Sequence, residues 1–313
     1  MGTLADLRKA AGGGGGYWAG FALAVVGAVL FSAKAIVAKL TYRYGVDALT
    51  VMGFRMLFAL PFFAAVAAMQ AWRVRTGRLA PLSRRDSLTI LGLGFIGYYL
   101  SSYLDFLGLQ YISAGLERLI LFLSPTFVLM ISALYLKRRI SGAQWLAMGL
   151  SYLGVLFVFV HDLSFTGGNV LLGATFVLGS AFTYAIYLIC SGEILKRIGS
   201  TRLVAYAMTS SAIYATVHFL VQHGWQSLKQ PVEIYELSLI HSVAHTFLPT
   251  FMIMWAVARI GAPLTAQLGM IGPVSILFLA WWFLGEPITT LQILGTICVL
   301  AGMLVLSRVR PAN

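Results

Sequence analysis

Charged side chains are scarce in this chain of 313 residues, and acidic ones are the scarcest. Asp, Glu, Lys and Arg together make up 10% of the sequence, with 10 acidic residues against 22 basic ones. An ordinary soluble domain is about one quarter charged. Hydrophobic residues account for 59% of the chain and the mean hydropathy is +0.87, which is more apolar surface than a water-soluble fold can bury. The sequence therefore predicts an integral membrane protein.

Cysteine and the short motifs of nucleotide and hydrolytic chemistry are also nearly absent. The two cysteines, Cys190 and Cys298, lie in separate apolar runs, which excludes a disulfide framework and a CxxC metal site. The sequence contains no Walker loop, nucleophile elbow or Rossmann fingerprint, so we expect no enzyme activity, no catalytic residues and no cofactor. His241 and His245 lack the glutamate of an HExxH site. We interpret them as a titrating or hydrogen-bonding polar pair and expect no bound metal.

Long apolar runs fill the rest of the sequence. A hydrocarbon core of roughly 30 Å needs about 20 apolar residues in a helix. Ten runs approach or exceed that length, without the alternating pattern of a membrane barrel. The predicted fold is an all-α integral membrane protein with ten transmembrane helices. Their approximate bounds are Tyr17–Leu40, Ala48–Trp72, Leu88–Tyr111, Gly115–Leu136, Gly142–Val160, Val170–Ser191, Leu203–Gln222, Leu237–Val257, Pro263–Leu284 and Ile288–Ser307.

The basic residues indicate the orientation of these helices. With a cytoplasmic N-terminus, 16 Lys and Arg residues fall in inner segments and four in outer segments, while Lys34 and Arg55 lie within spans. This positive-inside bias predicts that both termini are cytoplasmic, in a multi-pass protein of a bacterial-type inner membrane. The formal charge of +12 is then a topology signal. We therefore expect the lipid bilayer and a small-molecule substrate as partners, not nucleic acid, and the oligomeric state stays open.

The second half of the chain repeats the first. Residues 112–156 align without gaps on residues 260–304, at a constant offset of 148. Identical pairs at this offset include Pro125 with Pro273, Gln144 with Gln292 and Gly154 with Gly302. Because each copy has five helices, an odd number, the second copy must enter the membrane from the opposite side, as in secondary transporters. We expect flexible cytoplasmic tails at residues 1–16 and 309–313 and inverted repeats at residues 17–161 and 162–308.

These repeats resemble those of EamA-type members of the drug/metabolite transporter superfamily. The resemblance rests on residues 111–158 and 259–306, and most of all on LGEP at residues 284–287, followed by Gln292, Gly295 and Gly302. It implies ten helices, inverted five-helix halves and the movement of small metabolites. The first repeat departs from the pattern, with KRR at residues 137–139 where the second has GEP. That departure is expected if the first segment is cytoplasmic and the second lies outside.

Six charged residues lie in or beside the spans of the first half, all in the predicted outer half of the membrane. They are Lys34, Lys39, Arg55, Asp105, Glu117 and Arg118. A charge inside a bilayer costs about 2.5–3.5 kcal/mol on insertion scales. We expect Lys39 and Arg118 to extend to the interface. Arg55, Asp105 and Glu117 are expected to form one gating network at the outer end of a substrate cavity. The surplus of two positive charges indicates either an anion site or a set of structural ion pairs.

Polar side chains at helical spacing complete the expected site. The predicted substrate-binding set is Lys34, Tyr98, Ser102, Asp105, Glu117, Ser124, Thr183, Tyr187, His245 and Gln267. Hydroxyl groups in membrane helices often only bond across helices, and that alternative stays open for half of the hydroxyls. Pro125 and Pro273 lie near mid-span, where each removes one backbone hydrogen bond of the helix. We expect them to act as hinges or to form kinks that line the cavity, and the alternative is that they are simply tolerated kinks.

Together these features predict a secondary transporter that moves a small metabolite across the inner membrane by alternating access. The resemblance favours export of an amino acid or a related compound. The positive surplus supports the alternative of an organic-anion or phosphate-ester carrier. Outside transport, the alternative is a membrane scaffold or sensor. A proton bound at Asp105 or Glu117 is the coupling ion that the sequence allows.

The predicted topology is testable with reporter fusions. A fusion at Gly77 should report a cytoplasmic location and a fusion at Ser227 a periplasmic one, because the charge bias places these loops on opposite sides. Phosphatase and fluorescent-protein reporters measure the two locations. The same signal at both positions would contradict the ten-span topology.

Overall fold

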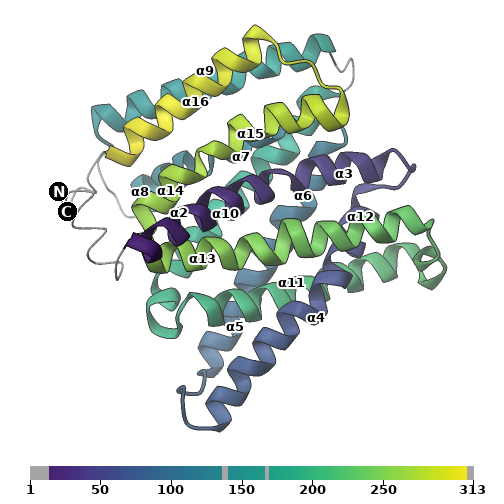
Figure 1. Ribbon diagram of the computed structural model, residues 1–313, viewed down its shortest axis with the longest axis vertical. Helices are drawn as coiled ribbons and strands as arrows, with labels where there is room; N and C mark the ends of the chain where they lie inside the picture. The colour runs from purple at the N-terminus through teal and green to yellow at the C-terminus, as the bar shows by residue number, and fades with distance from the viewer. Residues whose placement is uncertain (1–13, 136–139, 166–168, 309–313) are drawn as a thin grey trace.

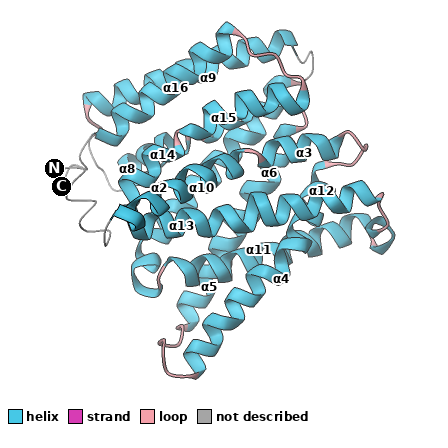
Figure 2. Cartoon of the chain, in the orientation of Figure 1, coloured by secondary structure: helices cyan, strands magenta, loops and turns pink. Residues whose placement is uncertain are grey.

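The computed structural model describes residues 14–135, 140–165 and 169–308. Residues 1–13 of the first predicted tail, the whole of the second at residues 309–313, and the basic residues 137–139 lie outside the described residues. In the described ranges the chain forms helices and no strands (Figures 1 and 2). The helices are α2 (Gly14–Ser32), α3 (Lys34–Tyr42), α4 (Ala48–Arg75), α5 (Arg84–Leu93), η1 (Gly94–Leu100), α6 (Ser101–Leu109), α7 (Ala114–Leu121), α8 (Ser124–Tyr135), α9 (Gly142–Phe165), α10 (Val170–Ile198), α11 (Ser200–His223), η2 (Trp225–Leu228), α12 (Val232–Ser242), η3 (Val243–Phe247), α13 (Leu248–Ile260), α14 (Ala262–Gly269), α15 (Ile271–Leu279), η4 (Ala280–Leu284) and α16 (Thr290–Arg308).

The all-α fold with ten spans is confirmed. Ten helical stretches of the described chain are long and apolar enough to cross a membrane. Their bounds agree with the predicted ones to within a few residues. The largest difference is in the eighth span, predicted to begin at Leu237 and observed over Val232–Ile260. Polar residues at its outer end, such as Glu233 and Glu236, interrupt the apolar run in the sequence but continue the helix.

Three spans are interrupted near their middle. The first is divided at Ala33 between α2 and α3, the fourth at residues 122–123 between α7 and α8, and the ninth at Met270 between α14 and α15. The fourth and ninth breaks lie at the same place in the two predicted repeats, because residue 122 corresponds to residue 270 at the offset of 148. A break releases backbone groups from the helical ladder and leaves them available to other partners.

Proline explains where the fourth and ninth spans break. Pro125 and Pro273 lie in the first turn of the half-helices that follow the breaks, α8 and α15, and close to the middle of the 21-residue spans. Pro125 has no N–H to donate to the carbonyl of Leu121. The hydroxyl of Ser124 donates to that carbonyl instead, at 2.6 Å. The prolines thus mark the breaks, and their predicted role as hinges stays a prediction.

The third and eighth spans share a second irregularity. Each contains a π-helical segment, η1 in the third span and η3 in the eighth. Residues 95–99 of η1 correspond to the whole of η3 at the same offset of 148. Such segments occur frequently at functional sites because they interrupt regular helical pairing.

Helices from the two predicted repeats pack against each other in pairs. The main pairs are α9 with α16, α4 with α11, α2 with α13, and α6 with α10 (Figure 1). Glycine permits the closest approach, since a Cβ at Gly154 would lie 2.4 Å from the Gly295 carbonyl oxygen, and one at Gly302 would lie 2.6 Å from the Ala147 carbonyl oxygen. The offset of 148 relates Gly154 to Gly302 and Ala147 to Gly295, so it converts one of these contacts into the other. The contact between α9 and α16 is therefore symmetric.

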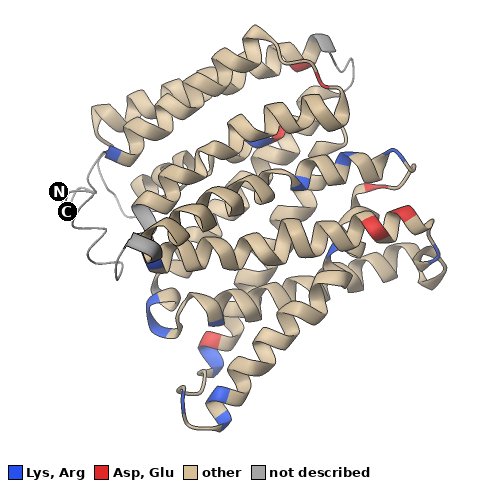
Figure 3. Ribbon diagram, viewed as in Figure 1, with Lys and Arg blue, Asp and Glu red and all other residues tan. Residues whose placement is uncertain are grey.

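The charged residues are distributed unevenly between the two ends of the bundle. Lys and Arg gather toward the end where α2 begins and α16 ends, and at the turn between α4 and α5, whereas most Asp and Glu lie toward the opposite end (Figure 3). The second end is the one predicted to face outward. A smaller group of charges of both signs lies between the ends, inside the bundle.

Substitution at Gly154 tests the close helix contact. We expect Gly154→Ala to destabilise the protein by about 1–3 kcal/mol, because the added methyl group meets backbone atoms that cannot move aside. Gly149→Ala on the same helix is the matched control, since a Cβ there meets nothing within 4 Å, and helix propensity predicts a small gain. Thermal unfolding of the two variants in detergent measures the difference. Equal stability of both variants would show that α9 and α16 do not approach so closely.

Candidate functional site

The buried charges of the first half meet at Lys34, the first residue of α3. Its Nζ atom lies 2.6 Å from Oδ2 of Asp105 and 3.6 Å from Oε1 of Glu117. The Lys34 side chain is 12% exposed and the two carboxylates are almost fully buried. One ammonium group therefore joins the first, third and fourth spans inside the bundle.

Local structure explains how these three side chains meet. Lys34 follows directly after the break at Ala33, so its side chain leaves the first span at an interruption of the helix. Asp105 lies on α6, after the π-helical segment η1. Glu117 lies in the first turn of α7, whose N-cap Ser113 accepts a hydrogen bond from the N–H of Leu116. An acidic residue is favourable in that turn because the helix dipole is positive there.

Arg55 joins this group through a different partner from the one expected. It was predicted to share a network with Asp105 and Glu117, but its Nη2 donates to the Ser102 hydroxyl at 3.1 Å and its guanidinium lies 4.8 Å from the Phe106 ring centre. Asp105 pairs with Lys34 instead. The sequence placed Lys34 in the binding set but did not predict that it would be the link between the two carboxylates.

The expectation that Lys39 and Arg118 extend to the membrane interface is wrong for Arg118. Its side chain is buried at 7% exposure, with the guanidinium 5.6 Å from the ring centre of Phe31 and 5.3 Å from that of Phe122. Lys39 is partly exposed and lies 3.5 Å from Oε1 of Glu286. The surplus of two positive charges therefore falls to one, because the sequence count did not include Glu286 as a partner.

Glu286 closes a contact between the two halves of the chain. Besides pairing with Lys39, its Oε1 accepts a hydrogen bond from the backbone N–H of Ala114 at 3.3 Å. Burial raises the pKa of Glu286, while Lys39 and the Ala114 N–H act in the opposite direction. Glu286 lies in the segment between the ninth and tenth spans. Sequence reasoning used it as a family motif and missed it as a charge partner.

The predicted polar residues divide into two groups. The Tyr98 and Tyr187 hydroxyls lie 3.0 Å apart, so the third and sixth spans are linked as expected from their polar faces. The hydroxyl of Thr183 bonds within its own helix, and that of Ser124 bonds across the break to the Leu121 carbonyl at the end of α7. Gln267 is exposed on α14. The described contacts therefore bring neither Thr183 nor Gln267 to the charges around Lys34.

His245 has a structural partner at the first break. Its Nδ1 lies 2.8 Å from the carbonyl oxygen of Leu30, which is close to the end of α2. The neighbouring His241 is fully buried, and its Nε2 has no hydrogen-bond partner. Within the described residues no three His, Cys, Asp or Glu side chains form a group that could hold a metal ion. The pair therefore belongs to the polar interior around the breaks.

Six of the eleven buried polar side-chain atoms that lack a hydrogen-bond partner in the described chain lie in this region. They are Arg55 Nε, Asp105 Oδ1, Glu117 Oε1 and Oε2, Arg118 Nε and His241 Nε2. Native proteins leave few buried polar groups unsatisfied, because each costs about 1–3 kcal/mol. A group of unsatisfied donors and acceptors in one place is typical of a site that takes up water or a ligand.

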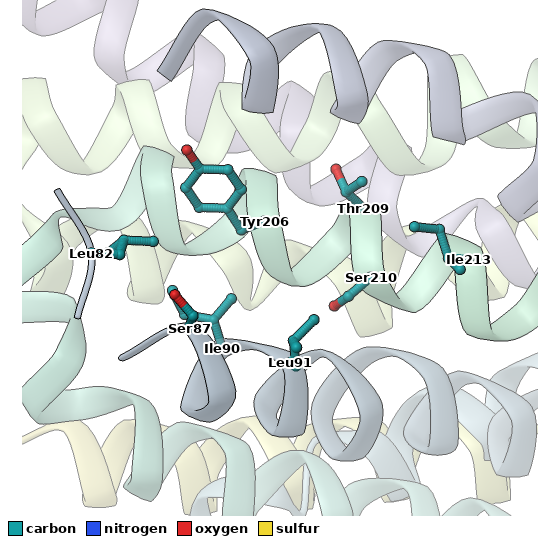
Figure 4. Close-up of a pocket in the computed structure, with 8 residues that line it drawn as sticks. All are labelled: Leu82, Ser87, Ile90, Leu91, Tyr206, Thr209, Ser210 and Ile213. Atoms are coloured by element: carbon teal, nitrogen blue, oxygen red, sulfur yellow. The ribbon is translucent and has the colours of Figure 1, made fainter. Parts of the chain in front are cut away.

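A separate pocket lies between α5 and α11. It has a volume of about 430 Å³ and contains none of the residues predicted for the substrate site (Figure 4). Its lining residues are Leu82, Ser87, Ile90, Leu91, Tyr206, Thr209, Ser210 and Ile213. The Ser87, Thr209 and Ser210 hydroxyls donate to carbonyls near them in sequence. This pocket therefore offers a ligand mainly apolar surface.

Ten apolar helices, three of them interrupted beside buried charges, are typical of multi-pass membrane transporters. The pattern of the EamA-like transporter family matches residues 18–160 and again residues 171–308. The chain belongs to this family, and so to the drug/metabolite transporter superfamily.

Curated relatives are transporters by name. The chain is 30% identical over 287 residues to the uncharacterized transporter YcbK of Bacillus subtilis, covering 88% of this chain and 89% of that protein. It is 25% identical over 246 residues to the threonine/homoserine exporter RhtA of Salmonella typhimurium, covering 78% and 77%. A crystal structure of a protein with 14% identity matches with a TM-score of 0.61 over 92% of this chain and 96% of that one, which shows a shared fold.

Neutralising Lys34 tests the ion-pair cluster. We expect Lys34→Met to destabilise the protein by about 3–5 kcal/mol, because two buried carboxylates lose their cation. Asp105→Asn should cost less, since Lys34 retains Glu117, and the double variant should cost clearly less than the sum of the two. Lys229→Met, at an exposed position, is the control. Thermal unfolding measures all four variants. Wild-type stability of Lys34→Met would contradict the pairing.

Proposed function

We propose that the protein is a secondary transporter that exports an amino acid or a related small metabolite across the bacterial inner membrane by alternating access. The observation that carries this proposal is the set of buried, partly unpaired charges around Lys34, beside the helix breaks and in the membrane interior. Intramembrane ionisable residues mark substrate and ion pathways. If these buried charges only stabilised the fold, we would expect each of them to have its full set of ion-pair and hydrogen-bond partners.

The internal symmetry supports alternating access. The packing of α2 with α13 and of α6 with α10 is the pattern expected if the first span relates to the sixth and the third to the eighth. The α9–α16 contact and the matched breaks agree with the same relation. Inverted repeats of this kind supply two conformations of similar energy that open the site to opposite sides. The division into repeats at residues 17–161 and 162–308 belongs to this proposal.

The contacts of Glu286 support a closed outer end in the conformation described here. Glu286 joins Lys39 at the end of the first span to the start of α7 at Ala114. The neighbouring Ser113 N–H donates to Asp162 Oδ2 at 2.7 Å, which ties α7 to α9. In the proposed cycle these contacts separate when the site opens outward. Arg55, Asp105 and Glu117, which were predicted to gate the outer end, then lie deeper in the same substrate pathway.

The charge balance narrows the substrate class. Of the six charged residues identified from the sequence, three cations and two anions are left when Lys39 pairs with Glu286, so this group carries one positive charge in excess. A carboxylate-bearing substrate fits this excess. The name of the relative RhtA, a threonine/homoserine exporter, favours an amino acid. An organic-anion carrier is the alternative, and a proton on Asp105 or Glu117 is the proposed coupling ion.

Transport into proteoliposomes tests the proposal. Purified protein in vesicles loaded with unlabelled threonine or homoserine should accumulate the labelled amino acid by counterflow, and a proton gradient should change the net flux. Vesicles without protein and vesicles with Lys34→Met are the controls. A thermal-stability screen against amino acids, sugars and organic anions runs in parallel, because a ligand at 100 times its Kd adds about 2.7 kcal/mol of stability. If none of these compounds is exchanged and none stabilises the protein, the result would favour the alternative of a membrane scaffold or sensor.

A further inference from the structure

Arg118 is a buried cation with no ion-pair partner within 4 Å among the described residues. Its side chain is 7% exposed, its Nε has no hydrogen-bond partner, and no acidic side chain in the described chain forms an ion pair with it. The other buried cations differ in this respect. Lys34 has the carboxylate of Asp105, and Arg55 has the hydroxyl of Ser102. Among these three, Arg118 alone makes neither a hydrogen bond nor an ion pair within the described residues, and the rings of Phe31 and Phe122 lie beside its guanidinium.

The position of Arg118 is determined by three interrupted spans. Phe31 lies near the end of α2, Phe122 lies at the break after α7, and Gly272 lies at the start of α15. A Cβ at Gly272 would lie 3.0 Å from Nη2 and 3.3 Å from Nε of Arg118, so the guanidinium packs against the backbone of the ninth span. A glycine at this position makes room for the group. Arg118 is thus held in the interior and does not reach the membrane surface.

The neighbouring Glu117 offers the opposite chemistry. Both of its carboxylate oxygens are buried without a hydrogen-bond partner, and Lys34 is 3.6 Å away, beyond hydrogen-bonding distance. Asp105 Oδ1 is likewise unpartnered. Consecutive residues of α7 therefore present an unfilled donor group and unfilled acceptor groups. An organic anion would satisfy only the donors and leave the acceptors unpaired, whereas a zwitterion would satisfy both kinds.

We propose that Arg118 binds the carboxylate of a zwitterionic α-amino acid substrate and that Glu117 binds its ammonium group. The planar guanidinium presents parallel N–H donors that match a carboxylate in a two-point contact. An ammonium group donates to the Glu117 oxygens that Lys34 leaves free. This assignment rests on the proposed transport function and adds the recognition of both ends of the substrate.

The test compares three probes on the wild-type protein in detergent. The twenty proteinogenic L-amino acids and homoserine are screened by thermal stabilisation, and the tightest binder is then compared with its amide and with its deaminated acid. The wild type should prefer the amino acid to each analogue by about 10- to 100-fold in Kd, the range for a charged hydrogen-bonded contact. No binding of any amino acid would refute the transport proposal itself. Equal binding of the amino acid and its amide would refute the assignment of Arg118 while leaving transport intact.

Variants then assign each end of the substrate. Arg118→Gln should lose the preference for the amino acid over the amide, to within about threefold, and keep its preference over the deaminated acid. Glu117→Gln should do the reverse. Arg75→Gln, at an exposed position, is the matched control and should retain both preferences. An equal loss of binding for all three probes in Arg118→Gln would show a structural role and overturn the assignment.

Gly272→Ala keeps the test decisive if Arg118→Gln does not fold. The added methyl group would lie 2.8 Å from Ser32 Oγ and 3.0 Å from Nη2 of Arg118, so it displaces both groups without removing the charge of Arg118. The preference over the amide should therefore fall at least threefold, while the preference over the deaminated acid is unchanged. Gly149→Ala, where a Cβ meets nothing, is its control. Unchanged preferences in Gly272→Ala would overturn the proposal.

Discussion

The cost of an uncompensated charge in hydrocarbon is the constraint on which the interior of this protein depends. Each intramembrane charge needs a partner, a water-filled space or a ligand. Lys34 meets this requirement with two carboxylates, and Lys39 meets it with Glu286. Arg55 and Arg118 meet it only partly, through a hydroxyl and aromatic rings. The part of the membrane interior that is least well satisfied is therefore also the part richest in potential ligand contacts.

The ten spans could be predicted because hydrophobic length is a local property of the sequence. Backbone groups in lipid must be satisfied within the segment, so a long apolar run has few alternatives to a helix. The breaks at the fourth and ninth spans were signalled by Pro125 and Pro273, because proline removes a helical donor. The break at Ala33 carries no such signal. It depends on tertiary partners, among them His245 at the Leu30 carbonyl.

Partners within the site could not be predicted as readily as its members. Lys34, Asp105 and Glu117 were identified from charge and depth, but sequence spacing contains no information on which cation faces which carboxylate across different spans. Arg118 was expected at the interface because it lies only four residues into its predicted span and has a long side chain. What holds it inside is packing against Gly272, a residue more than 150 positions away. Long-range contacts of this kind require the fold.

Interrupted helices and buried charges support each other in this arrangement. A continuous helix satisfies its own backbone and presents only side chains to a cavity, whereas a broken one also exposes carbonyl and N–H groups near the membrane centre. Lys34 follows the first break, and Arg118 packs beside the breaks of the fourth and ninth spans. A relative movement of the half-helices would therefore change the surroundings of these cations directly. In the proposed transport cycle, the substrate contributes binding energy where the polar groups are least satisfied, which is also the place where the two halves are proposed to move.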